Sequence, residues 1–185
     1  DKVLFTAWAG DEFKDRKASG YVTSEAQYRF RDHNLPMGRV AHLHVLAVAS
    51  GRVTDLFEGT AHELPRTDPD ANCFDISPDG RHIVFTHDPQ PEKRIENRKT
   101  LTELNLRSGK FETLTADADW DFDAPRYSPD GSHIAMSAAH TGKKHTMPGR
   151  AALLERGGRW HLLSDEWDHS VEGPLRWADD ASALY

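Results

Sequence analysis

Aspartate occupies every second position from Asp117 to Asp123, which makes this segment the most obvious candidate for a metal site. Carboxylate oxygens are the ligands that Ca²⁺ prefers. A calcium-binding EF-hand loop that began at Asp117 would need glycine at its sixth position and glutamate at its twelfth, where the chain has Phe122 and Ser128. We therefore expect these carboxylates to bind no metal.

Histidine is abundant, with eleven in 185 residues, and imidazole is a common metal ligand. His42 and His44 are two residues apart and so share one face of a strand, while His140 and His145 flank a Gly-Lys-Lys turn. A zinc site needs three or four converging ligands, and no Cys-x-x-Cys or His-Glu-x-x-His motif frames them. We expect ordinary strand and loop histidines, with neither a metal nor a cofactor.

The sequence carries no motif for nucleophilic catalysis. It has no Gly-x-Ser-x-Gly elbow, no phosphate-binding glycine-rich loop and no dinucleotide-binding fingerprint. We predict that no catalytic residue lies in this chain, and the sequence assigns no substrate-binding residue.

Charge and composition exclude several classes of partner. The formal net charge of −7 and the lack of clustered Lys and Arg argue against nucleic-acid binding. No run of apolar residues is long enough to cross a membrane. We expect the true N-terminus to lie outside this chain, so the lack of a signal peptide leaves the compartment open. We predict a soluble protein without a membrane partner, either cytoplasmic or periplasmic. The single cysteine, Cys73, heads an apolar strand, which favours a buried thiol.

A β-hairpin around Ser77-Pro78-Asp79-Gly80 is the element that organises the chain. Proline presets φ at the first corner of a type I turn, aspartate caps the turn, and glycine takes the left-handed position. In the second strand Ile83 and Phe85 point to one face, and Val84 and Thr86 to the other.

The hairpin recurs about fifty residues later at Ser128-Pro129-Asp130-Gly131, and a degraded third copy spans Trp177 to Tyr185. A second type of hairpin alternates with the first. Its three copies are His42 to Phe57, Leu101 to Leu114 and Ala151 to Leu163, which turn at Ser50-Gly51, Ser108-Gly109 and Gly157-Gly158.

Two hairpins per period give four strands per repeat, as in the blades of a β-propeller. The sequence predicts an all-β fold, a β-propeller fragment of about three and a half four-stranded blades within residues 1–185. The blades lie near 1–71, 72–123, 124–174 and, incompletely, 175–185. Both ends of the chain fall inside blades, so we expect a piece of a longer protein that self-associates or needs the rest of its chain.

Two insertions interrupt the repeats. Residues 10–41 contain Tyr28-Arg29-Phe30-Arg31, which alternates aromatic and basic side chains and fits either a blade strand with a polar face or a recognition strip. Residues 88–99 form a charged loop, for which the sequence favours a solvated role over a binding role.

These motifs, taken in order, resemble the propeller of the prolyl oligopeptidase family of serine peptidases, and its dipeptidyl aminopeptidase and acylaminoacyl peptidase branches most of all. The matching segments are Tyr28 to Val45, Asp75 to Gly80, Leu114-Thr115, Ala124 to Gly131, and Leu162 to Glu172 with Arg176-Trp177.

The resemblance implies that the propeller caps a C-terminal α/β-hydrolase domain, outside this chain, which carries the Ser-Asp-His triad. The propeller would admit short or unfolded peptides and help to bind them, so a peptide and the hydrolase domain are the implied partners. The paired-glutamate motif of the dipeptidyl peptidase branch has no counterpart, which leaves open whether cleavage is exo or endo. A homo-oligomer also stays open. The alternative is a non-enzymatic, protein-binding propeller such as the periplasmic one of the Tol translocation system.

Overall fold

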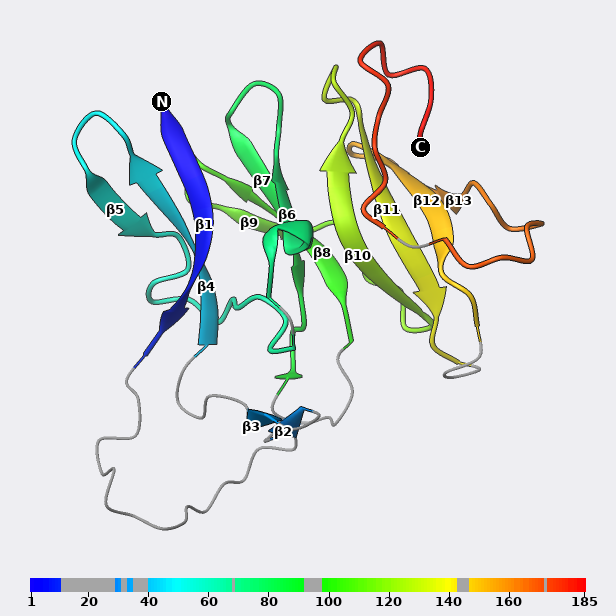
Figure 1. Cartoon of the computed structure of the whole chain (residues 1–185), viewed down its shortest axis with the longest axis horizontal. Helices are drawn as coiled ribbons and strands as arrows, with labels where there is room; N and C mark the ends of the chain where they lie inside the picture. Colours follow the sequence, from blue (N-terminus) through cyan, green and yellow to red (C-terminus); the bar gives the residue numbers. More distant parts are fainter. Residues whose placement is uncertain are drawn as a thin grey trace. The chain divides into compact units, whose positions relative to one another are not determined.

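The computed structural model describes residues 1–10, 29–30, 33–34, 40–67, 69–91, 98–142, 147–171 and 173–185 (Figure 1). These residues form strands β1 to β13 and one short 3-10 helix, and they contain no α-helix. The predicted all-β fold class is confirmed. None of the described segments contains a helix long and apolar enough to span a membrane.

The chain divides into two compact units, which we call unit 1 and unit 2. Unit 1 comprises residues 1–71 and 88–98, and unit 2 comprises residues 72–87 and 99–185.

Unit 1 contains a three-stranded antiparallel sheet in the order β1-β4-β5. Its strands are β1 (Lys2–Ala9), β4 (Val40–Ala47) and β5 (Arg52–Asp55). The predicted turn between β4 and β5 is confirmed, with Gly51 at a φ of 70°. A separate two-residue ladder joins β2 (Arg29–Phe30) to β3 (His33–Asn34).

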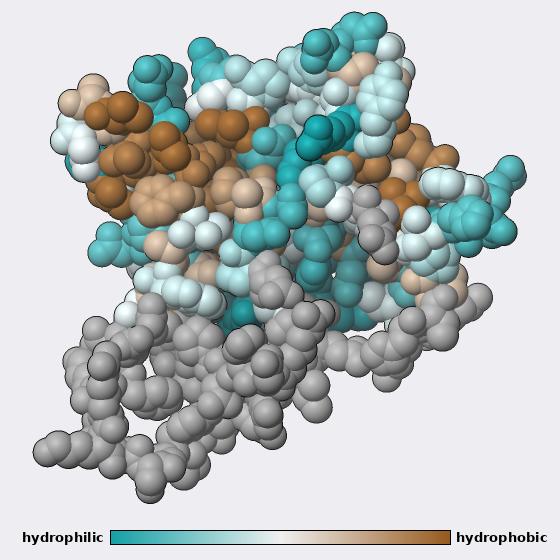
Figure 2. Space-filling model, in the orientation of Figure 1, coloured by the Kyte–Doolittle hydropathy of each residue, from teal (hydrophilic) through white to brown (hydrophobic). Residues whose placement is uncertain are grey.

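Apolar side chains gather over the unit 1 sheet, as Figure 2 shows. The register aligns Val3 with Leu46 and Leu46 with Val53, so these residues share one face of the sheet. Val3 and Val53 are both about half exposed. An apolar sheet face of this kind is more typical of a packed surface than of one in contact with water.

Unit 2 contains two four-stranded antiparallel sheets, each a simple meander. The first sheet follows a 3-10 turn, η1 (Ala71–Cys73), and contains β6 (Phe74–Ile76), β7 (His82–His87), β8 (Thr100–Asn105) and β9 (Phe111–Thr113). The second contains β10 (Trp120–Tyr127), β11 (His133–His140), β12 (Arg150–Glu155) and β13 (Trp160–Leu162). The hairpins predicted from Ser77-Gly80, Ser108-Gly109, Ser128-Gly131 and Gly157-Gly158 are all present.

The core of unit 2 lies between its two sheets. Val84 and Leu101 from the first sheet pack in one cluster with Phe122, Ile134 and Met136 from the second. Ile83 and Phe85, on the other face of β7, are also fully buried. A central strand of a propeller blade is covered on both faces. Successive side chains of β7 therefore alternate between two buried faces, and not between a buried face and an exposed one.

The first Ser-Pro-Asp-Gly turn is held by a closed set of hydrogen bonds. The Ser77 hydroxyl donates to Asp79 at 2.6 Å and accepts the backbone N–H of His82 at 2.9 Å. The Asp79 carboxylate also accepts the N–H of Arg81 at 3.0 Å, and Gly80 has a φ of 67°. The sequence specifies this turn locally, because every one of these groups lies within six residues.

The second copy repeats this geometry almost atom for atom. Ser128 donates to Asp130 at 2.5 Å and accepts the N–H of His133 at 3.0 Å, and Gly131 has a φ of 73°. Ser132 in turn donates its N–H to Asp130 at 3.0 Å.

The degraded third copy keeps the turn, although of the serine, proline, aspartate and glycine only the aspartate remains. The N–H of Ala178 donates to the carbonyl of Ala183 at 2.8 Å, and Asp180 accepts the N–H of Ser182 at 3.0 Å. Ala178 stands in place of the capping serine. Ala181 stands in place of the glycine and has a φ of 60°, which is unfavourable for a residue with a Cβ atom.

Candidate functional site

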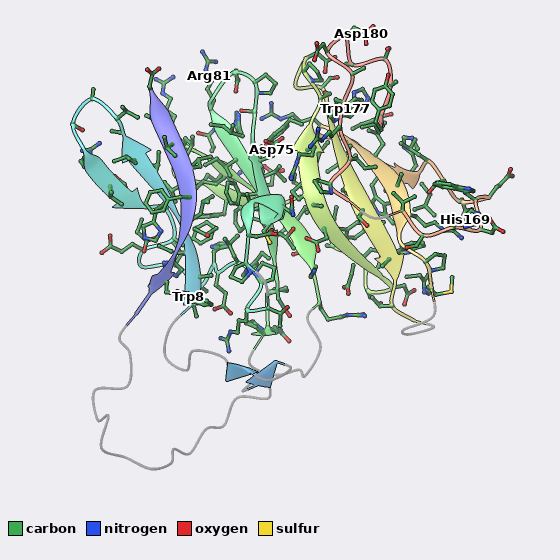
Figure 3. All side chains as sticks on the ribbon, in the orientation of Figure 1. Trp8, Asp75, Arg81, His169, Trp177 and Asp180 are labelled. Carbon is green, nitrogen blue, oxygen red and sulfur yellow. The ribbon has the colours of Figure 1, made fainter. Side chains whose placement is uncertain are left out.

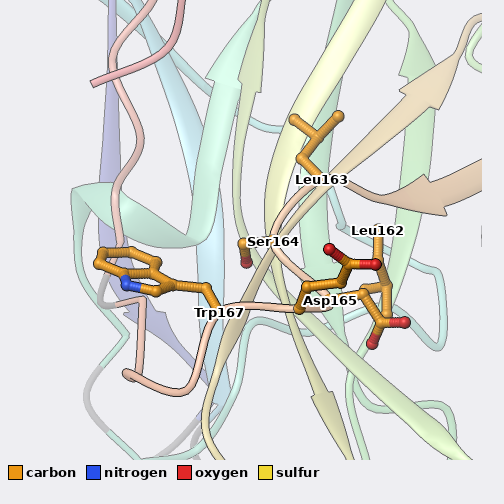
Figure 4. A pocket seen from close by; sticks show the side chains of 6 residues that line it. Leu162, Leu163, Ser164, Asp165 and Trp167 are labelled. Atoms are coloured by element: carbon orange, nitrogen blue, oxygen red, sulfur yellow. The ribbon is translucent and has the colours of Figure 1, made fainter.

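A hollow lies beside the loop that follows β13, which we call the Trp167 loop (residues 163–171). The hollow has a volume of about 620 Å³ and is open to solvent. It is lined by Leu162, Leu163, Ser164, Asp165, Glu166 and Trp167 (Figure 4).

The start of the Trp167 loop is fixed by hydrogen bonds to β12. The N–H of Ala151 donates to the Ser164 hydroxyl at 3.0 Å, and the N–H of Leu163 donates to the carbonyl of Ala151 at 2.8 Å. The Arg150 guanidinium donates to the Ser164 carbonyl at 3.2 Å. Thr115 plays the same role as Ser164 in the preceding sheet, where its hydroxyl accepts the N–H of Leu101 at 2.9 Å. The repeat therefore sets where the loop begins.

The far end of the loop returns to the residue just before the same strand. The N–H of Val171 donates to the carbonyl of Gly149 at 2.8 Å, and the N–H of Gly149 donates to the Ser170 hydroxyl at 3.1 Å. Figure 3 shows His169 near the outer tip of the loop. Its ring meets that of Trp167 edge-on, with a centroid distance of 5.7 Å.

The aspartates from Asp117 to Asp123 do not converge. Asp117 caps the N–H of Asp119 at 3.0 Å, and Asp121 accepts the N–H of Lys99 at 3.0 Å. Asp123 accepts a hydrogen bond from the Lys99 ammonium. The carboxylates of Asp117, Asp121 and Asp123 thus accept hydrogen bonds from the chain itself. Within the described residues, no group of His, Cys, Asp and Glu side chains has an arrangement that would hold a metal ion.

The Lys99 ammonium connects the two sheets of unit 2. Burial alone would lower the pKa of Lys99, but the charge and hydrogen bond of Asp123 outweigh it and raise the pKa above its usual value. Asp123 also accepts the hydroxyl of Thr86 from β7 at 3.0 Å. Cys73 is buried, as predicted, and lies close enough to Lys99 to make a smaller contribution to this rise in its pKa. This arrangement is structural, because its charges are already paired.

His42 and His44 share a strand face, as predicted, and both face Asp55 of β5. The Oδ2 atom of Asp55 lies 2.8 Å from His42 Nδ1 and 3.7 Å from His44 Nε2. Burial would raise the pKa of Asp55, but hydrogen bonds from His42 and from the N–H of Phe57 lower it below its usual value. The sequence indicated the histidine pair and the hairpin that contains it, but it did not single out Asp55, which the strand register places opposite His44.

The structure describes only part of the other segments that the sequence analysis singled out. His140 packs edge-on against Trp120 at a centroid distance of 4.9 Å, and His145 lies outside the described residues. In the 88–99 loop, Asp88 accepts the N–H groups of Gln90 at 2.9 Å and Arg98 at 2.8 Å, and residues 92–97 lie outside the described part. Tyr28 and Arg31 also lie outside it.

Sequence reasoning assigned no role to the Trp167 loop beyond its resemblance to a blade junction. A signal was available: Trp167 stands among Asp165, Glu166 and Asp168, and a large aromatic residue within an acidic run is unusual for a solvated turn. Only the structure shows that the tryptophan is exposed.

Neither a known protein family nor a curated protein matches this chain. Solved structures do match. TolB from Acinetobacter baumannii is 15% identical over 78% of this chain and 31% of that protein, with a TM-score of 0.54. The chain has a β-propeller fold. Oligogalacturonate lyase from Vibrio parahaemolyticus is 10% identical over 88% of this propeller chain and 47% of the lyase, with a TM-score of 0.50.

A prolyl endopeptidase structure is 18% identical over 78% of the propeller chain and 22% of that enzyme, and its TM-score of 0.44 is too low for a structural argument. The propeller chain spans less than half the length of TolB and of the lyase. Because a TolB protein and a lyase match about equally well, these similarities indicate the fold and no particular activity.

Proposed function

We propose that this chain is the propeller portion of a serine peptidase of the prolyl oligopeptidase family, in which it limits access to the active site and positions a peptide. The observation that carries the proposal is the ordered series of blade motifs from residue 28 to residue 185, which resembles that family along most of the chain. The paired sheets of unit 2 agree with this series of motifs.

In this role the propeller contributes orientation rather than proton transfer. The Ser-Asp-His triad would lie in a hydrolase domain outside this chain, and peptide cleavage would proceed by acyl transfer to its serine. Rigid blades would exclude folded proteins and hold a short peptide near that serine, which favours reaction by proximity.

A second candidate is a non-enzymatic propeller that binds proteins. It is favoured by the similarity to TolB from Acinetobacter baumannii, which has a TM-score of 0.54. Both candidates use the same fold, so the fold cannot distinguish them. They differ in whether the polypeptide also contains an activated serine.

The deciding experiment is an intact mass measurement of the native protein, with and without a fluorophosphonate probe that labels activated serines. A peptidase should give a species much heavier than the 20.8 kDa of this chain and take up one probe per polypeptide. Prior heat unfolding should abolish labelling, which controls for non-specific reaction. A native protein that ignores the probe would reject the peptidase and support the protein-binding propeller.

A further inference from the structure

The Trp167 loop has the character of a recognition surface, and the proposed function makes no use of it. We infer that this loop is a docking surface for an extended, basic peptide segment of a partner protein. The inference does not depend on peptidase activity, because an enzyme and a protein-binding propeller could both present such a surface.

The loop is held in place before any partner arrives. One end is hydrogen-bonded to β12 through Ser164 and Ala151, and the other is hydrogen-bonded through Val171 to Gly149, the residue before β12. Within the loop, the N–H of Trp167 donates to the Ser164 carbonyl at 3.2 Å. A preorganised loop loses little conformational entropy on binding, which favours affinity.

Large apolar side chains are exposed on this loop. Trp167 is 52% exposed and Leu163 is 47% exposed, and the ring of Trp167 contacts that of His169, whose side chain is itself 74% exposed. Tryptophan is strongly enriched among the residues that dominate binding energy at protein interfaces. An exposed tryptophan beside an exposed leucine, over a hollow of about 620 Å³, therefore suits contact with a partner.

The charge of the loop selects the partner. Asp165 and Glu166 line the hollow and are exposed, and Asp168 follows Trp167. In the part of the chain that the structure describes, neither Asp165 nor Glu166 forms an ion pair with Lys, Arg or His. The neighbouring guanidinium of Arg150 is directed to the Ser164 carbonyl. A Lys or Arg side chain would complement these carboxylates, and it would also bind favourably over the face of an indole.

The spacing of these groups favours a peptide over a small cation. Figure 4 shows Trp167 and Asp165 extending to opposite sides of Ser164, so the loop offers an aromatic contact and an acidic contact in different directions. An extended peptide places successive side chains on opposite faces and advances about 3.3 Å per residue. It can therefore lay an apolar or basic side chain on Trp167 and a basic one beside Asp165 and Glu166.

The test is fluorescence anisotropy with the full-length protein and a labelled short peptide in which arginine alternates with leucine. The matched probe has glutamate in place of each arginine. We expect the basic peptide to bind and the acidic one not to bind. Trp167→Ala, and separately the double variant Asp165→Asn with Glu166→Gln, should each weaken binding by about tenfold or more. Trp167→Phe should keep most of the affinity, because an aromatic face is retained.

Matched controls are available elsewhere in the chain. Trp8→Ala removes another exposed tryptophan, and Glu112→Gln neutralises another exposed carboxylate. Neither should change binding. If Trp167→Ala lowers the melting temperature, the Asp165/Glu166 variant decides the question, because its side chains are exposed and close in size to the originals.

Three results would overturn the inference. Binding of neither peptide, or of both equally, would show that the loop does not select basic segments. Equal losses for the loop variants and for Glu112→Gln would indicate non-specific attraction to an acidic protein. Sedimentation velocity supplies the third result. If Trp167→Ala abolishes self-association and leaves peptide binding unchanged, the loop contacts a second copy of the chain.

Discussion

The phenol of Tyr127 in β10 donates a hydrogen bond of 2.7 Å to the carboxylate of Glu103 in β8, and so links the two sheets of unit 2. The guanidinium of Arg156 lies 3.2 Å from the same carboxylate. Burial, together with the hydrogen bond and charge of Glu103, raises the pKa of Tyr127 well above its usual range. This buried link joins adjacent sheets by polar contacts as well as by apolar packing.

Replacing Tyr127→Phe should lower the free energy of unfolding by about 1.5–3 kcal/mol, because the bond it removes ends on a charged group. Urea unfolding would measure the loss. A double-mutant cycle with Glu103→Gln should show clear coupling between the two sites. Independent effects of the two substitutions would mean that the hydrogen bond contributes nothing to stability.

The same pair predicts a loss of stability in alkali. Because the folded state holds the phenolic proton more tightly than the unfolded state, this contribution is complete below a pH of about 10 and is lost as pH rises further. Tyr127→Phe should therefore lose less stability than the parent protein between neutral and strongly alkaline pH. An identical alkaline profile for both proteins would contradict the pKa shift.

Asp75 forms a second link between the sheets, with its carboxylate 2.8 Å from the N–H of Tyr127. Burial raises the pKa of Asp75 despite this hydrogen bond and that from Ile76. The folded state thus binds the proton more tightly, so the stabilising contribution is present below about pH 3.9 and is lost as pH rises through the folded-state pKa.

We expect Asp75→Asn to be well tolerated at neutral pH, because the amide keeps an acceptor for Tyr127 and carries no buried charge. Asp75→Ala should cost about 1–3 kcal/mol, since the N–H of Tyr127 loses its acceptor. Unfolding titrations at several pH values would compare the two. A larger loss for the asparagine variant than for the alanine variant would show that the negative charge itself is needed.

The hydroxyl of Ser128 is the main reason that the pKa of Asp130 is lowered to about 2. Ser128→Ala should therefore raise the pKa of Asp130 toward its usual value. Carboxyl NMR titration would follow the change, and Asp79 provides the control because Ser77 lowers its pKa in the same way in the first turn. If Ser128→Ala leaves the pKa of Asp130 where it was, the hydroxyl is not the cause.

Ala181 occupies the position that glycine holds in the first two turns, with a φ of 60° beside 67° for Gly80 and 73° for Gly131. Ala181→Gly should stabilise the protein by roughly 0.5–1 kcal/mol, since glycine avoids the steric cost of this conformation but loses more entropy on folding. Gly131→Ala is the reciprocal variant and should destabilise by a similar amount. Thermal unfolding would show whether the two shifts have opposite signs.

The repeated hairpins and their turns could be predicted from the sequence because their determinants are local. Ser77, Asp79 and Gly80 specify a turn by groups within a few residues of one another, and the same residue types recur at the same spacing around Ser128. The period of these motifs then predicted four-stranded sheets, which the structure confirms in unit 2. The burial of Cys73 was predicted on similar grounds.

Contacts between sheets were decided by the tertiary structure alone. Asp75 and Tyr127 are separated by 52 positions, and nothing in the local pattern around either residue indicates that they meet. The same holds for Lys99 beside Asp123, the last aspartate of the run that begins at Asp117. The exposure of Trp167 also depends on how its loop is tied to β12. Turn geometry arises from short-range sterics and hydrogen bonds, whereas the contacts of a side chain across sheets depend on where distant strands pack.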